Sequence, residues 1–344
     1  MTASQFQGKA CPVHFIMLER DATPSIGWFF KSAQHRRVAW QYWVNDTILG
    51  FVYLAFHYVF RLAPTDTCSS IGSAIGSFAR NHIRFDIGEF RRSGRDEARA
   101  RQNWAWLRPT DNSPATVEAV MEQAYRQGAQ TYLEFSVLHR LWPEGRIAVE
   151  GAEHLAAARA TGCCTLVVGV HVGNWETIGP ALIGLGHKTT IVYQKPINRF
   201  DHRMAVAARR RYGAALVPPG RAGGRIAYRA LADASGVLLL YIDEFVNGRV
   251  YAPFFGRPAM LEGNIANAAR LAAMTDAIVI PVYCTRLDGA RFKVTFMPPV
   301  DIERTADSQA DLAANVAKLN ATIEPIVRTH LEQWLWLFDI RADR

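Results

Sequence analysis

The sequence predicts an α/β protein with a mainly parallel sheet and helices on both faces. From about residue 147 onward, short β-branched apolar runs alternate with helical segments. Such runs are typical of strands that are buried on both faces. One of them, Cys163–Val170, continues through a glycine into a helix start, as strands of a parallel sheet do. We therefore expect an α/β domain over residues 111–344, preceded by a helical, membrane-associating region over residues 1–110.

Length and composition narrow the class of protein. The chain has 344 residues, of which 49% are hydrophobic, so it can bury a sizeable core. Its 39 basic residues exceed 31 acidic ones and give a net charge of +8. This excess favours anionic partners such as acidic lipid headgroups, phosphorylated substrates, an acidic carrier protein or nucleic acid. Five cysteines without a Cys-x-x-Cys pair fit a reducing compartment.

The N-terminal part contains a long apolar and aromatic segment. Residues 1–35 lack the pattern of a secretory signal. Residues 38–62 are rich in Trp, Tyr and Phe but are interrupted by Asn45, Asp46 and His57. A spanning helix carries fewer polar residues, whereas Tyr and Trp gather at the membrane–water interface. We favour a monotopic helix in one leaflet, with a buried core helix as the first alternative and a true span as the second.

The next segment, residues 65–110, is predicted to be helical and basic. Its arginines form either a face against an anionic membrane or a solvated helix surface. No helix-turn-helix, zinc-finger or RNA-binding signature accompanies them. The arginines are Arg80, Arg84, Arg91, Arg92, Arg95, Arg99, Arg101 and Arg108.

The remaining elements follow from periodicity and from helix start and stop signals. Before the α/β part, residues 116–141 are predicted to form one amphipathic helix. The predicted strands are 166–170, 189–193, 214–217, 237–242, 277–284 and 292–296. The predicted helices are 174–185, 199–212, 225–234, 265–274 and 307–336. Asn174 and Asp307 are expected to cap the first and last of these helices.

A histidine and a glutamate mark the candidate site. His171 follows a predicted strand, at the edge where open α/β sheets bind ligands, and Glu176 comes five residues later. An imidazole is the usual general base for an alcohol, and a carboxylate on its other nitrogen fixes the tautomer. The spacing permits that pair. It equally permits a glutamate that complements the helix dipole and a histidine that bonds to a loop carbonyl.

The run His171-Val172-Gly173-Asn174-Trp175-Glu176 resembles the signature of the bacterial lipid A biosynthesis acyltransferases, the late-acting lauroyl and myristoyl transferases. These enzymes belong to the lysophospholipid-acyltransferase-like superfamily. Further blocks similar to the family's follow in its order, namely residues 193–198, 209–213, 243–244, 254–259 and 324–336. The resemblance covers most of the chain, since the family also has an apolar helix near its amino terminus.

The resemblance implies direct acyl transfer from an acyl-carrier protein or coenzyme A thioester to a hydroxyl of a membrane glycolipid. Such a reaction belongs to lipopolysaccharide biosynthesis at the cytoplasmic face of the bacterial inner membrane. His171 acts as the base, Glu176 orients its ring, and no resident cofactor is needed. Arg209 or Arg211 is expected to hold a phosphate, and the candidate oxyanion donors are backbone N–H groups around Gly173 and the helix start, or a nearby arginine. The expected substrate-binding residues are Gly173, Asn174, Arg209, Arg211, Asp243, Phe255 and Gly256.

Other features limit these expectations. His-Glu-x-x-His and clustered Cys/His ligands are absent from the sequence, so we expect no metal. Phe255 and Gly256 fit a core-and-turn role as well as an acyl-chain groove. Glu244 stands where the family commonly has Gln or His, which leaves the acceptor open. The alternatives are transfer to another lipid, such as a phosphatidylinositol mannoside or an aminolipid, a thioesterase with the same His–Glu pair, or a non-catalytic lipid-binding protein.

Overall fold

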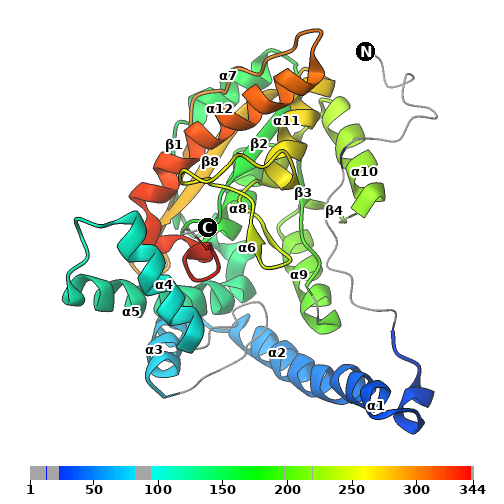
Figure 1. Cartoon of the computed structure of the whole chain (residues 1–344), viewed down its shortest axis with the longest axis vertical. Coiled ribbons are helices and arrows are strands. Elements are labelled where there is room, and N and C mark those ends of the chain that lie inside the picture. The colour runs from blue at the N-terminus through cyan, green and yellow to red at the C-terminus, as the bar shows by residue number, and fades with distance from the viewer. Residues whose placement is uncertain (1–12, 14–22, 83–93, 197, 219, 342–344) are drawn as a thin grey trace.

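The computed structural model describes residues 13, 23–82, 94–196, 198–218 and 220–341 (Figure 1). Its centre is a seven-stranded sheet with the order β1-β9-β8-β2-β5-β3-β4. Neighbouring strands run parallel except β8 and β9, which are antiparallel. The predicted α/β class and mainly parallel sheet are therefore confirmed. The strands are β1 (Ile147–Glu150), β2 (Thr165–Gly169), β3 (Thr189–Val192), β4 (Ala215–Val217), β5 (Val237–Tyr241), β8 (Ile278–Arg286) and β9 (Phe292–Phe296), with a separate hairpin of β6 (Phe245–Val246) and β7 (Arg249–Val250).

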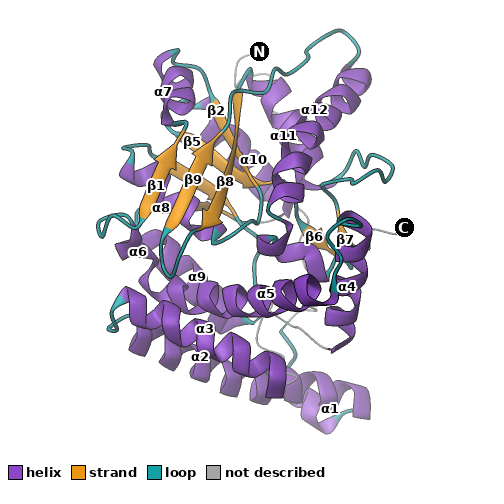
Figure 2. Cartoon of the chain, turned by 90° about the vertical axis from the view of Figure 1, so that its left-hand side faces the viewer, coloured by secondary structure: helices purple, strands orange, loops and turns teal. Residues whose placement is uncertain are grey.

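Helices cover both faces of the sheet, because its central strands are apolar on both sides. All residues of β2 are buried, with Leu166 and Val168 in one hydrophobic cluster and Val167 in another. On the first face lie α10 (Gly220–Ala232), α11 (Gly263–Thr275) and α12 (Ser308–Thr329). On the other face lie α6 (Leu138–Leu141), α7 (Ala152–Ala160) and α8 (Ile178–Gly184), as Figure 2 shows.

Two predicted helices end earlier than expected. The helix predicted over 116–141 divides into α5 (Pro114–Glu134), a 3₁₀ turn and α6. The helix predicted to reach Trp336 ends at Thr329, while Asp307 caps its start as expected. Beyond Thr329 the chain bonds to another segment, since the N–H of Leu335 donates to the carbonyl of His171 (2.9 Å). A tertiary contact therefore holds the segment that follows the last helix.

The N-terminal helices form a layer below the edge of the sheet toward which β8 and its parallel neighbour β2 run (Figure 2). This helix layer consists of α1 (Ala33–Trp40), α2 (Asp46–Phe60) and α3 (Thr65–His82), with a π-helical turn between α1 and α2. Helix α9 (Arg199–Arg211) packs on α2, and α3 packs along α5. Among the described residues, no helix is both long and apolar enough to cross a membrane. The boundary between residues 110 and 111 stays a prediction.

Helix α2 is buried on one side only, so it is not a core helix. Gly50, Tyr53 and Phe60 face the protein. Large apolar side chains at the end of α1, on the other side of α2 and in the turn after α2 are exposed. They are Trp40, Ile48, Leu49, Phe51, Val52, Phe56, Tyr58, Val59 and Leu62.

Where the structure describes them, the arginines of residues 65–110 make ion pairs and hydrogen bonds within the protein. Arg80 is nearly buried, and its guanidinium pairs with Glu97, Glu118 and Glu122. Arg99 and Arg108, on and just after α4 (Gly94–Leu107), donate to backbone carbonyls of the C-terminal segment. These side chains hold helices together. The side chains of Arg84, Arg91, Arg92 and Arg95 lie outside the described part of the chain.

Candidate active site

His171 lies just beyond the carboxyl end of β2, and its partner comes from the neighbouring strand. Strands β2 and β5 pair in parallel, which brings Asp243 beside His171 although the two are far apart in sequence. The ring Nδ1 of His171 lies 2.7 Å from Oδ1 of Asp243. The backbone N–H of His171 (2.8 Å) and Nε1 of Trp334 (2.9 Å) both donate to Oδ2. With three donors around it, the fully buried Asp243 carboxylate holds the ring in one orientation.

Glu176, the expected partner of His171, binds a different residue. Its carboxylate accepts two hydrogen bonds from the guanidinium of Arg209, at 3.1 Å from Nε and 2.5 Å from Nη2. Both side chains are largely buried. The structure therefore brings all four predicted residues to one place, but it pairs His171 with Asp243 and Glu176 with Arg209.

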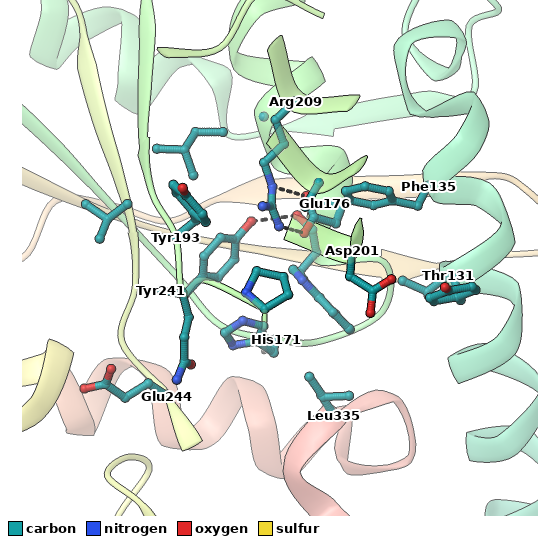
Figure 3. Close-up of a pocket in the computed structure, with 18 of the residues that line it drawn as sticks. Thr131, Phe135, His171, Glu176, Tyr193, Asp201, Arg209, Tyr241, Glu244 and Leu335 are labelled. Carbon is teal, nitrogen blue, oxygen red and sulfur yellow. Dashed lines mark hydrogen bonds and ion pairs between the residues drawn. The ribbon is translucent and has the colours of Figure 1, made fainter. Parts of the chain in front are cut away.

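A pocket opens in front of His171 (Figure 3). In the view of Figure 3, His171 lies between the Glu176–Arg209 pair on one side and Glu244 on the other. Three aromatic rings surround the imidazole, with centroids at 4.6 Å for Tyr241 and 5.2 Å for Trp175 and Trp336. Apolar side chains line much of the remaining wall, namely Phe135, Ile191, Val192, Pro196, Met204, Ala205 and Leu335. An imidazole and an ion pair thus share a largely apolar cavity.

Burial sets the protonation of several groups in this pocket. It raises the pKa of Glu244 to about 7, and the charge of Asp243 acts in the same direction. Burial likewise raises the pKa of Tyr241 far above its usual value, so its hydroxyl stays neutral and donates to the carbonyl of Trp175 (2.8 Å).

Asn174, expected as a helix cap and a substrate contact, is buried and does not line the pocket. Its side chain makes no cap hydrogen bond; instead Nδ2 donates to Glu134 Oε2 (2.8 Å). Glu134 also pairs with Arg286, whose Nη1 lies 2.6 Å from Oε1. This buried group fastens the loop after β2 to α5 and β8.

Gly173 has a structural role in the same loop. Its φ is +61°, and a Cβ there would lie 2.6 Å from the carbonyl oxygen of Cys284, so a side chain does not fit. Its N–H, expected to be an oxyanion donor, already donates to the carbonyl of Gln333 (3.0 Å).

The other predicted substrate residues lie away from the pocket wall. Phe255 is buried against the ring of Trp334 (centroids 5.6 Å apart), and its N–H donates to Glu324 (2.9 Å). Gly256 forms the turn that follows, with φ of +85°. The structure thus places Phe255 in the core and Gly256 in a turn. Arg211 is exposed at the end of α9, outside the pocket.

Sequence reasoning named Asp243 as a substrate contact but not as the partner of His171, and it did not place the aromatic rings of Tyr241 and Trp336 beside the imidazole. A carboxylate at a strand end was a visible signal, but only the sheet order shows which strand end lies next to His171. Nothing in the local pattern places the C-terminal tryptophans there. Within the part of the chain that the structure describes, no group of three His, Cys, Asp or Glu residues is placed to hold a metal ion.

Comparisons with known proteins point to one family. Residues 35–339 match the family model described as bacterial lipid A biosynthesis acyltransferase. No curated protein matches the chain. Among solved structures, the 1-acyl-sn-glycerophosphate acyltransferase PlsC from Thermotoga maritima is similar over 69% of this chain and 96% of that one, with 13% identity and a TM-score of 0.35.

Proposed function

Because this chain belongs to the bacterial lipid A biosynthesis acyltransferase family and is an acyltransferase that acts on a lipid, we propose a specific reaction for it. It transfers a fatty acyl chain from an acyl-carrier protein or coenzyme A thioester to a hydroxyl of a membrane glycolipid. The observation that carries this proposal is the His171–Asp243 hydrogen bond (2.7 Å) at the floor of a largely apolar pocket.

In the proposed reaction His171 is the general base. With Nδ1–H donating to Asp243, Nε2 keeps a lone pair that removes the acceptor's hydroxyl proton. The hydroxyl oxygen forms a bond to the thioester carbonyl carbon, which gives a tetrahedral oxyanion. When the C–S bond breaks, the imidazolium returns its proton to the leaving thiolate. The Asp243 carboxylate stabilises the imidazolium between these two steps.

Arg209 supplies positive charge to the same pocket. Glu176 holds its guanidinium by two hydrogen bonds, so we assign Glu176 a positioning role rather than direct contact with His171. Of the two arginines expected to hold a phosphate, only Arg209 lines the pocket. The guanidinium is therefore our candidate for binding a substrate phosphate or the developing oxyanion.

The exposed apolar side chains of α1 and α2 support a membrane location. Many exposed apolar side chains on neighbouring helices are typical of an interaction site on a protein, and the aromatic residues among them suit the membrane–water interface. We propose that this surface enters the cytoplasmic leaflet of the bacterial inner membrane and that no resident cofactor takes part.

Mass spectrometry of membrane lipids tests the reaction. Cells that carry the gene should contain a lipid one acyl chain heavier than any lipid of cells without it. A His171→Ala variant should lower the rate of product formation by about a hundredfold to ten-thousandfold, because the base is lost. His154→Ala is the matched control, because His154 lies on α7 and does not line the pocket. Release of free fatty acid without a lipid product would favour a thioesterase instead, and an active, folded His171→Ala protein would overturn the base assignment.

A further inference from the structure

The end of the pocket opposite Arg209 carries two polar side chains that the proposed reaction does not use. Glu244 follows Asp243 directly at the end of β5, yet the two carboxylates face different ways: Asp243 lies behind His171, and Glu244 lines the pocket. Asn264 is the second residue of α11 and also lines the pocket. Figure 3 shows Glu244 on the far side of His171 from Arg209.

Both side chains present hydrogen-bond acceptors. Glu244 accepts the backbone N–H of Asn264 at Oε1 (2.5 Å), which anchors the carboxylate at the helix start. The side-chain Nδ2 of Asn264 donates to the carbonyl of Tyr241 (2.9 Å). That bond leaves Oδ1 of Asn264 buried and without a partner among the described residues. A buried oxygen in this state costs free energy, so a donor group that came within hydrogen-bond distance of it would bind favourably.

We propose that Glu244 and Asn264 bind hydrogen-bond donors, either hydroxyl or ammonium groups, on the polar headgroup of the acceptor lipid. This inference rests on the proposed acyl transfer and deepens it. Two acceptors side by side favour a donor-rich headgroup and disfavour a phosphate or carboxylate at this end. An anionic group of the same substrate is attracted to Arg209 at the opposite end. His171 lies between them, where the reacting hydroxyl has to be.

The ionisation of Glu244 makes this binding pH-dependent. Its pKa is raised to about 7 by burial, so the carboxylate is largely protonated at pH 6 and largely ionised at pH 8. An ionised carboxylate accepts a stronger hydrogen bond than a neutral carboxyl group. Binding of a donor group should therefore strengthen as the pH rises from 6 to 8. The titratable groups that face Glu244 are Asp243, Tyr251 and, across the pocket, His171 and Tyr241.

Binding of three octyl compounds by the full chain tests the inference without an acyl donor. The probes are octyl β-glucoside, its 2-amino-2-deoxy analogue and 1-octanol, each measured by titration calorimetry at pH 6 and pH 8. The wild-type protein should bind the glucoside more tightly than 1-octanol, and the preference should grow with pH. Glu244→Gln keeps the size of the side chain but places an NH₂ in the pocket. It should reduce the preference at pH 8 by roughly three- to tenfold and remove its pH dependence.

Two further variants make the result decisive. Glu262→Gln is the control, because Glu262 is an exposed carboxylate that precedes the same helix and makes no cap hydrogen bond. It should keep the wild-type preference. Asn264→Leu should reduce the preference but retain its pH dependence, and it provides an independent test if Glu244→Gln does not fold.

The outcomes separate this inference from the proposed reaction. If the amino compound gains more affinity over 1-octanol than the glucoside does, the bound donor is an ammonium group. If both compounds gain equally, the bound donor is a hydroxyl. The inference is overturned if Glu244→Gln and Asn264→Leu both bind the probes with the wild-type preference. Failure of the proposed reaction shows itself differently, as the absence of a lipid product in the mass-spectrometric test.

Discussion

The carboxyl edge of the sheet buries charged groups, whereas the helix layer α1–α3 exposes apolar ones. At the sheet edge, Asp243 and Glu134 are both fully buried, and each carboxylate is surrounded by donors. In the helix layer, apolar side chains such as Ile48 and Val59 are about as exposed as polar surface residues, at 59% and 64%. The geometry at the sheet edge is fixed by hydrogen bonds within the chain, whereas the described residues of the helix layer leave apolar side chains exposed, as interaction surfaces do. Substitutions at the sheet edge should therefore lower the rate of acyl transfer, whereas substitutions in the helix layer should weaken binding to membranes.

Between the two regions, the larger effect is expected at the sheet edge, for Asp243→Asn. An amide does not stabilise the imidazolium as a carboxylate does, and its NH₂ faces the donors of His171 and Trp334. We expect kcat for acyl transfer to fall by about a hundredfold or more, with the KM for the thioester nearly unchanged. Steady-state kinetics in detergent measures both constants, and thermal unfolding checks that the variant is folded. A folded variant with wild-type kcat would show that the carboxylate has no part in the reaction.

A smaller effect is expected in the helix layer, and only with membranes. The double substitution Ile48→Glu and Val59→Glu places two charges on the exposed side of α2. Binding to phosphatidylglycerol-containing vesicles should weaken by about tenfold or more, because apolar burial in the bilayer is lost. Transfer to a detergent-dispersed acceptor should stay near the wild-type rate.

The control for this double variant is Leu287→Glu with Ile226→Glu, two exposed apolar residues far from α2 in the sequence. Flotation of the protein with vesicles on a density gradient compares the two pairs. Equal vesicle binding by both double variants would show that the exposed apolar side chains of α2 contribute no more to membrane binding than those elsewhere on the surface.

The same comparison shows what the sequence was able to predict. The strand, turn and histidine around residue 171 are encoded within a dozen residues, so local pattern located them. The partner of His171 depends on β2 lying next to β5, and strand order arises from packing of the whole domain. Glu176 was a reasonable candidate from spacing, but Arg209 at the end of α9 occupies its carboxylate.

In the helix layer too, local composition predicted some features and not others. Apolar and aromatic composition predicted one helix over residues 38–62, where the structure has the end of α1, a π-helical turn and α2, the last with an exposed apolar side. Composition also indicated a basic face over residues 65–110, against a membrane or in solvent, whereas Arg80, Arg99 and Arg108 bond within the protein. The carboxylates that pair with Arg80 include Glu118 and Glu122 on α5, and no local pattern shows that α3 and α5 pack side by side.

The smallest functional effect is expected for Arg80→Met. This variant removes an ion-pair cluster inside the protein and leaves the exposed apolar side chains of α2 unchanged. The guanidinium of Arg80 points at Glu97, Glu118 and Glu122 rather than outward, so its loss leaves three carboxylates close together. Because Glu118 is itself exposed, we expect the free energy of unfolding to fall by only about 1–2 kcal/mol. Urea denaturation measures this change, with Arg221→Met, at an exposed position on α10, as the control. Vesicle binding by Arg80→Met should equal that of the wild type. A loss as large as that of the Ile48 and Val59 double variant would mean that Arg80 meets the membrane, and that charge as well as apolar surface holds the helix layer there.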